Sequence, residues 1–181
     1  LKDPFQRDKD AGLAACAEAT KALAPKLNAF ANGDGDDDAA LATMRLFVLV
    51  SLWGNRMDLS IWPAAGATAS GASGEAASST RAARAFDEAL RAGEECLLWD
   101  DSAAAARAIL ETGRDKIGLV VDNAGFELVC DLALADAIVI ARDKINGRDS
   151  SAHRAVVTLH VKAHPVFVSD AMSKDVRDTI D

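Results

Sequence analysis

The chain has 181 residues, of which 50% are hydrophobic and 27% are charged, a composition typical of a folded domain and not of a disordered segment. The formal net charge of -8 and the pI of about 4.8 argue against a nucleic-acid backbone or an anionic membrane surface as the main partner. The apolar runs are too short to span a bilayer and no secretory signal peptide is visible, so we expect a cytoplasmic protein.

The first part of the chain has the patterns of helices. Residues 5–31 are rich in Ala, Lys and Leu and lack strand-forming runs, which predicts helical structure. The acidic turn GDGDDD, residues 33–38, lacks the closing Glu of a calcium loop, so we expect it to cap the next helix and not to bind calcium. That helix is expected over 38–56, and the run LATMRLFVLVSLW is apolar nearly all round, which indicates burial.

A low-complexity segment follows this helix. Residues 63–80, PAAGATASGASGEAASST, have the composition of a flexible linker or of an insertion in a surface loop. Another helix is expected over 81–93, with Gly93 as its C-cap. We therefore divide the chain into a helical N-terminal region, 1–95, with an insertion at 63–80, and an α/β region, 96–181.

The second part of the chain alternates between strand and helix patterns. The expected elements are an Ala-rich helix to about 112, a strand over 117–121 (IGLVV), a helix over 124–141, a polar loop over 142–154, a strand over 155–161 (AVVTLHV) and a last helix after 170. A crossover of more than thirty residues containing a helix predicts that the two strands are parallel neighbours.

Polar side chains follow both predicted strands. Asp122 and Asn123 end the first strand and begin a helix, while Lys162 and Asp170 follow the second strand. Parallel strands bring such residues to one edge, where chemistry gathers in α/β folds. Carboxylate and amide oxygens suit Mg²⁺ or Mn²⁺, and a lysine beside them could clamp a phosphoryl group. The alternative is that Asp122 and Asn123 are ordinary helix N-caps.

Several blocks resemble a known family. VVDNAGFELVCDLALAD and HVKAHPVFVSD are similar to signatures of the damage-control phosphatases, in particular of their acidic residue methyltransferase-like group. SLWGNRMDLS, residues 51–60, resembles a third signature, and DPFQRDK resembles an early DPF segment of the family. The resemblance implies a metal-dependent phosphatase in which a helical N-terminal region precedes a three-layer α/β/α Rossmann-like core with parallel strands.

The resemblance also implies roles for individual residues. Asp122, Asn123 and Asp170 would hold a divalent metal such as Mn²⁺, Ni²⁺, Co²⁺ or Mg²⁺, and Asp122 and Asp170 would be catalytic. The substrates would be small phosphorylated metabolites, sugar phosphates such as fructose-1-phosphate and fructose-6-phosphate. The sequence gives no indication of the oligomeric state.

Four residues are candidate substrate contacts. Asn55 and Asp58 lie in the GNRMD block and either face the same pocket or form a helix C-cap and turn. Lys162 is either a phosphate ligand or a solvent-facing lysine. Glu127 lies one turn into the helix that follows Asn123, where it could support the metal ligands.

The chain departs from the family pattern in one respect. The family group carries a downstream Arg-Thr-x-Lys motif, whereas here the only similar run, at 177–179, is followed by Ile180. We therefore expect a C-terminally truncated piece of a longer protein. Two alternatives stay open, an S-adenosylmethionine-dependent protein carboxyl (glutamate) methyltransferase and an inactive truncated copy that acts as a binding module. No glycine-rich methyltransferase fingerprint supports the former.

Two smaller expectations concern cysteine and histidine. Three cysteines lie far apart, which indicates buried thiols in a reducing compartment. His160 and His164 have the spacing of a helical zinc pair, but they follow a strand pattern in which four residues span about 13 Å. We therefore set a zinc site aside.

Overall fold

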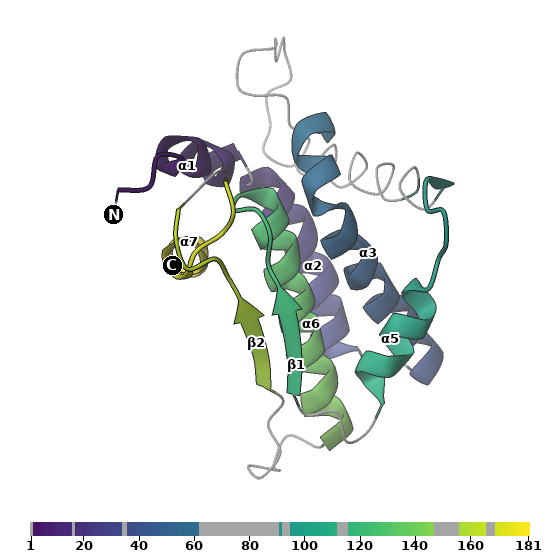
Figure 1. The fold of residues 1–181 in the computed structure, drawn as a ribbon. Helices are drawn as coiled ribbons and strands as arrows, with labels where there is room; N and C mark the ends of the chain where they lie inside the picture. Colours follow the sequence, from purple (N-terminus) through teal and green to yellow (C-terminus); the bar gives the residue numbers. More distant parts are fainter. Residues whose placement is uncertain are drawn as a thin grey trace.

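The computed structural model describes residues 2–15, 17–33, 36–61, 91, 95–111, 116–146, 156–165 and 169–181. Within these ranges the chain is mostly helical and carries one small sheet (Figure 1). The elements are α1 (Gln6–Ala15), α2 (Ala17–Asn32), α3 (Asp37–Ile61), α5 (Ser102–Leu110), β1 (Lys116–Val120), α6 (Phe126–Asn146), β2 (Val156–His160) and α7 (Ser173–Ile180).

The sheet consists of β1 and β2, which are parallel neighbours as the sequence predicts. Their register runs from Lys116 opposite Val156 to Val120 opposite His160. The α6 helix forms the crossover, and both strands point toward α1 and α7 (Figure 1). The residues that follow the two strands therefore meet at one edge, beside the N-terminus of α6.

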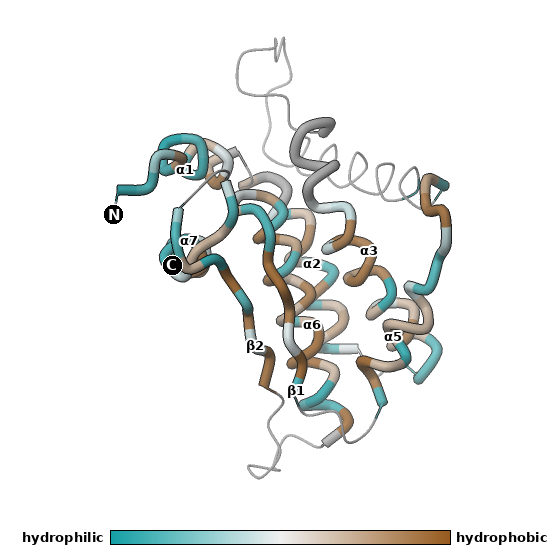
Figure 2. Tube along the Cα trace, viewed as in Figure 1, coloured by the Kyte–Doolittle hydropathy of each residue, from teal (hydrophilic) through white to brown (hydrophobic). Residues whose placement is uncertain are grey.

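The core lies between the helices and one face of the sheet. Met44 and Phe47 of α3 and Phe126 of α6 are fully buried, and each such side chain contributes about 1.5–3 kcal/mol by leaving water. Figure 2 shows hydrophobic residues along the helices where they face one another and the strands. On the opposite face of the sheet, Val120 is 85% exposed and Val156 is 54% exposed.

The helices differ from the predicted ones at their ends. The helical stretch expected over 5–31 contains α1 and α2, which lie on either side of residue 16, outside the described residues, and α2 continues through Pro25. The α3 helix was expected to end near 56 but extends to Ile61. The polar loop expected over 142–154 begins later, because α6 continues to Asn146.

The longer α6 has a physical reason in the neighbouring helices. Arg142, only 1% exposed, donates a hydrogen bond of 2.6 Å to the carbonyl oxygen of Ile109 in the last turn of α5. Lys144 donates to the carbonyl oxygens of Phe30 and Gly33 at the C-terminal end of α2. Carbonyl oxygens at the C-terminal end of a helix generally lack donors within that helix, and these hydrogen bonds from Arg142 and Lys144 supply them, which favours a helical conformation for this charged run.

Other expectations concern residues inside and outside the described ranges. Asp36 accepts a hydrogen bond of 2.9 Å from the N–H of Ala39, which confirms that the acidic turn caps α3. Cys130 is buried as expected, whereas Cys96 is exposed, so that expectation was wrong for it. The low-complexity segment at 63–80 and the helix expected over 81–93 lie outside the described residues, except for residue 91. None of the described helices has the length and apolar character needed to cross a membrane.

Candidate functional site

The backbone brings Asn123 and Asp170 together although they lie far apart in the sequence. The two residues form an antiparallel pair. The N–H of Ala124 donates to the carbonyl of Ser169 at 3.1 Å. The N–H of Ala171 donates to the carbonyl of Asp122 at 2.7 Å. In such a pair the two side chains project to the same side from Cα atoms about 4.5 Å apart. Main-chain hydrogen bonds therefore place the amide beside the carboxylate.

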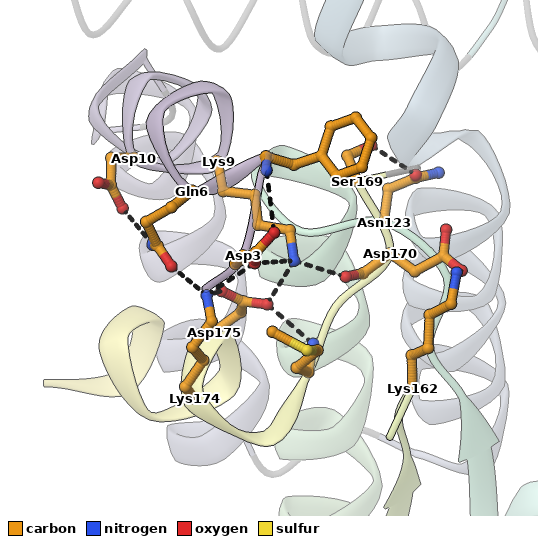
Figure 3. A network of polar contacts seen from close by, with 12 residues as sticks. Asp3, Gln6, Lys9, Asp10, Asn123, Lys162, Ser169, Asp170, Lys174 and Asp175 are labelled. Carbon is orange, nitrogen blue, oxygen red and sulfur yellow. Dashed lines mark hydrogen bonds and ion pairs between the residues drawn. The ribbon is translucent and has the colours of Figure 1, made fainter. Parts of the chain in front are cut away.

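Lys162 completes this edge of the sheet. Its main-chain N–H donates to the carbonyl of Ala171 at 2.9 Å, which attaches the chain just beyond β2 to the segment carrying Asp170. Its ammonium donates to Oδ2 of Asp170 at 2.5 Å, with both side chains only partly exposed. Figure 3 shows the Lys162 side chain directed at that carboxylate. Lys162 is thus ion-paired at this edge of the sheet, and its role as a phosphate ligand stays a prediction.

The amide group of Asn123 is held at both ends. Its Nδ2 donates to Oε2 of Glu127 at 3.0 Å and, at 3.4 Å, to Oδ2 of Asp122. Its Oδ1 accepts a hydrogen bond of 3.0 Å from the hydroxyl of Ser169. Since an amide oxygen has two acceptor sites, Oδ1 retains one for a cation. Glu127, in the first turn of α6, therefore contacts a candidate metal ligand, as its place shortly after Asn123 in the sequence suggested.

The turn between β1 and α6 exposes Asp122. Gly125, with φ of 92°, provides the backbone conformation that lets the chain enter α6 directly after Asn123. The Asp122 carboxylate is exposed, and its main-chain oxygen accepts the 2.7 Å hydrogen bond from Ala171. Asp122 thus combines a fixed backbone with a side chain that is accessible to a ligand.

A buried carboxyl behind these residues was missed by the sequence analysis. Asp131 lies one turn beyond Glu127 on α6, is 8% exposed, and accepts a hydrogen bond of 2.5 Å from the hydroxyl of Ser51. Burial raises the pKa of Asp131; the Ser51 hydrogen bond opposes this shift and the charge of Asp122 adds to it. The sequence did offer a signal, because Glu127 and Asp131 are four apart and therefore share a helix face.

The α3 helix approaches the site at Gly54. A Cβ atom at this position would lie 2.9 Å from Cα of Glu127 and 3.3 Å from Cβ of Cys130. Asn55 and Asp58 follow in the same helix, but their side chains lie outside what the structure describes. Because α3 continues to Ile61, the alternative of a C-cap and turn at Asn55 and Asp58 is wrong.

The donor atoms fit a hard divalent cation. Asp122 and Asp170 offer carboxylate oxygens and Asn123 offers an amide oxygen, the ligand type that Mg²⁺ and Mn²⁺ bind. Across the described ranges no three His, Cys, Asp or Glu side chains gather as a metal centre, so the candidate set depends on Asn123 as its third member. The ion pair with Lys162 uses one oxygen of Asp170, and a carboxylate has about four acceptor sites.

Comparison with known proteins connects this geometry to a family. Residues 1–181 match the model of the damage-control phosphatase ARMT1-like domain. Proteins named "Damage-control phosphatase ARMT1" are similar: that of Danio rerio is 30% identical over 135 residues, 74% of this chain and 26% of that protein. That of Xenopus laevis is 32% identical over 139 residues, 72% of this chain and 26% of that protein. The chain thus spans about a quarter of the length of these curated relatives. The chain belongs to the family defined by the damage-control phosphatase ARMT1-like domain.

Proposed function

We propose that this chain carries the metal- and phosphate-binding part of a metal-dependent phosphomonoester hydrolase. The substrates are small phosphorylated metabolites, sugar phosphates of the fructose-1-phosphate type. The observation that carries the proposal is the backbone pairing of Asn123 with Asp170, which gathers oxygen donors and the Lys162 ammonium from both strand ends. Membership of a phosphatase family supports the reaction class.

The proposed roles follow from the chemistry of each side chain. Asp122, Asn123 and Asp170 supply the oxygen ligands of a divalent ion, which, when bound, withdraws charge from a phosphate oxygen. Lys162 stands beside Asp170 and is placed to form charge-assisted hydrogen bonds with phosphate oxygens. Phosphoryl transfer depends mainly on positioning and on charge neutralisation, which these groups provide.

Two routes for the attack on phosphorus fit this arrangement. In one, an Asp122 oxygen attacks directly, the phosphorus–oxygen bond to the sugar breaks, and water later hydrolyses the acyl phosphate. In the other, Asp122 only holds the divalent ion and a water molecule attacks. An acid quench during turnover would trap a phosphorylated Asp122 in the first route and none in the second.

The architecture of the whole protein is part of the proposal. The sheet face that carries Val120 and Val156 is exposed, and a second layer of helices would cover it in a three-layer α/β/α Rossmann-like core. Residues 1–95 would form the helical region and 96–181 part of the catalytic core, with Asn55 and Asp58 contacting substrate. We propose a cytoplasmic location.

The direct test is phosphate release from fructose-1-phosphate with added Mn²⁺, Co²⁺, Ni²⁺ or Mg²⁺. The chain is compared with its Asp122→Ala and Asp170→Ala variants, and with Asp136→Ala, which removes an exposed carboxylate elsewhere on α6. We expect metal-dependent turnover that both site variants lower at least about 100-fold and that the Asp136 variant keeps. Turnover that needs no metal, or that survives both site substitutions, would contradict the proposal.

A further inference from the structure

Lys9 is a buried lysine far from the sequence motifs that form the candidate site. It lies in α1, is 5% exposed, and its ammonium donates three hydrogen bonds. The acceptors are Oδ2 of Asp3 at 3.0 Å, Oδ2 of Asp175 at 2.8 Å and the main-chain oxygen of Asp170 at 2.7 Å. An ammonium has three N–H donors, so this set uses all of them.

The charges around Lys9 are balanced by a second lysine. Lys174 pairs with Oδ1 of Asp175 at 2.7 Å and with Oδ2 of Asp3 at 3.0 Å, which gives two cations for two carboxylates (Figure 3). Burial alone would raise the pKa of Asp3, but hydrogen bonds from Lys174, the Phe5 N–H and Lys9 outweigh it and lower that pKa to about 2. Burial likewise opposes ionisation of Asp175, but hydrogen bonds from Lys174, Lys9 and the Met172 N–H outweigh it and lower the pKa of that carboxyl, so both carboxylates are ionised partners in one cluster.

Asp170 links this cluster to the candidate metal site, of which its own carboxylate is a part. Lys9 binds its main-chain oxygen on one side, whereas Lys162 binds its carboxylate on the other (Figure 3). The cluster also anchors the chain just beyond, because Asp175 accepts the N–H of Met172 at 2.8 Å. A contact 161 residues apart in sequence therefore fixes the segment whose pairing with Asn123 forms the site.

We propose that Lys9 is a positioning residue for the candidate metal site. Its ammonium fixes the main-chain oxygen of Asp170, and this contact sets where the Asp170 carboxylate stands relative to Asn123. The consequence for metal binding rests on the proposed function, whereas the consequence for the backbone pairing of Asp170 does not. Groups that orient metal ligands in this way typically change metal affinity 10–100-fold when removed.

Lys174 offers a matched control for Lys9. Both lysines pair with Asp3 and Asp175, but only Lys9 donates to Asp170. Lys9→Met and Lys174→Met are therefore compared with the parent chain by amide hydrogen exchange and by Mn²⁺ titration. The exchange reporter is the Ala171 N–H, whose 2.7 Å bond belongs to the Asn123–Asp170 pairing.

The expected results separate the two lysines. Exchange at Ala171, measured relative to core amides of α6, accelerates at least about tenfold in Lys9→Met and less than about threefold in Lys174→Met. The Kd for Mn²⁺ rises about 10–100-fold in Lys9→Met and less than about threefold in Lys174→Met. Equal effects of the two substitutions on Ala171 exchange would overturn the inference.

A charge-balanced pair of variants keeps the test decisive if Lys9→Met does not fold. Removing one partner of a buried ion pair leaves an uncompensated charge, which is strongly destabilising. Asp3→Asn combined with Lys9→Met leaves Lys174 paired with Asp175, while Asp3→Asn combined with Lys174→Met leaves Lys9 paired with Asp175. Both double variants carry one ion pair, but only the second retains the contact with Asp170, so faster exchange at Ala171 should appear only in the first.

The two readouts also separate this inference from the proposed function. A parent chain that binds no Mn²⁺ would contradict the proposed metal site, and Ala171 exchange would still decide whether Lys9 positions Asp170. A chain that binds Mn²⁺ with the same Kd in Lys9→Met and Lys174→Met would overturn the inference and leave the metal site standing.

Discussion

Replacing Gly54 by Ala should destabilise the protein, although the same change stabilises most helices. The added Cβ would lie 2.9 Å from Cα of Glu127, whereas carbon atoms in contact prefer about 3.5–4.0 Å. Because the atom it meets belongs to the backbone of α6, the two helices must move apart. Overpacking of this kind costs about 1–3 kcal/mol, and the better helix propensity of Ala returns at most about 1 kcal/mol.

Because the close contact is with backbone, we expect the cost to lie at about 2–3 kcal/mol. The expected net loss of stability is therefore about 1–2 kcal/mol, which corresponds to a fall in Tm of about 2–8 °C for a chain of this length. Thermal unfolding followed by circular dichroism measures it. Gly12→Ala is the matched control, because a Cβ there would meet its nearest neighbour at 3.7 Å, an ordinary contact. That variant should gain about 0.5–1 kcal/mol. A Gly54→Ala protein as stable as the parent would refute the close packing of α3 on α6.

Three further predictions concern charged groups near the site. Burial raises the pKa of Asp131 above its usual 3.8, so ionisation of this carboxyl opposes folding. In urea unfolding between pH 4 and 7, the Asp131→Asn variant should therefore gain stability relative to the parent as the pH rises. A stability difference that stays constant over this range would contradict the raised pKa. The pKa of Asp3 is lowered to about 2, so its contribution to the free energy of unfolding is present above pH 3.8 and is lost as the pH falls toward 2. In thermal melts, the stability advantage of the parent over Asp3→Asn should shrink as the pH falls through that range. An advantage that grows would contradict the lowered pKa. Glu127→Ala removes the hydrogen bond between the Asn123 amide and the Glu127 carboxylate, and it should raise the Kd for Mn²⁺ about 10–100-fold in a titration. An unchanged Kd would show that Glu127 does not orient Asn123.

The arrangement of residues at the edge of the sheet was predictable because it follows from short sequence patterns. An apolar β-branched run followed by Asp122 and Asn123 marks a strand end, and the crossover rule makes the next strand parallel. Lys162 and Asp170 then had to arrive at the same edge, as the ion pair between them confirms. The roles of these residues stay predictions, since geometry alone does not establish chemistry.

The interior polar contacts were not predictable in the same way. Lys9 is one of several charged residues in an N-terminal helix, and nothing in its local pattern distinguishes it from a solvated lysine. Its partners Asp170 and Asp175 lie 161 and 166 residues away. The end of α6 was not predicted for a related reason. Arg142 and Lys144 belong to a charged run typical of a loop, and the carbonyls they bind belong to other segments of the chain.

The most direct test of the account is a Mn²⁺ titration of the chain and its Asp122→Ala variant, followed by calorimetry or by the electron paramagnetic resonance of free Mn²⁺. Asp122 suits this test because its carboxylate is exposed, so its loss should leave the unfolding transition unchanged. If Asp122, Asn123 and Asp170 hold the metal, we expect one bound ion in the parent and in Asp136→Ala, and none in Asp122→Ala at the same concentrations. A parent that binds no Mn²⁺, or an Asp122→Ala protein that binds it equally well, would contradict the claim that Asp122, Asn123 and Asp170 form a metal site.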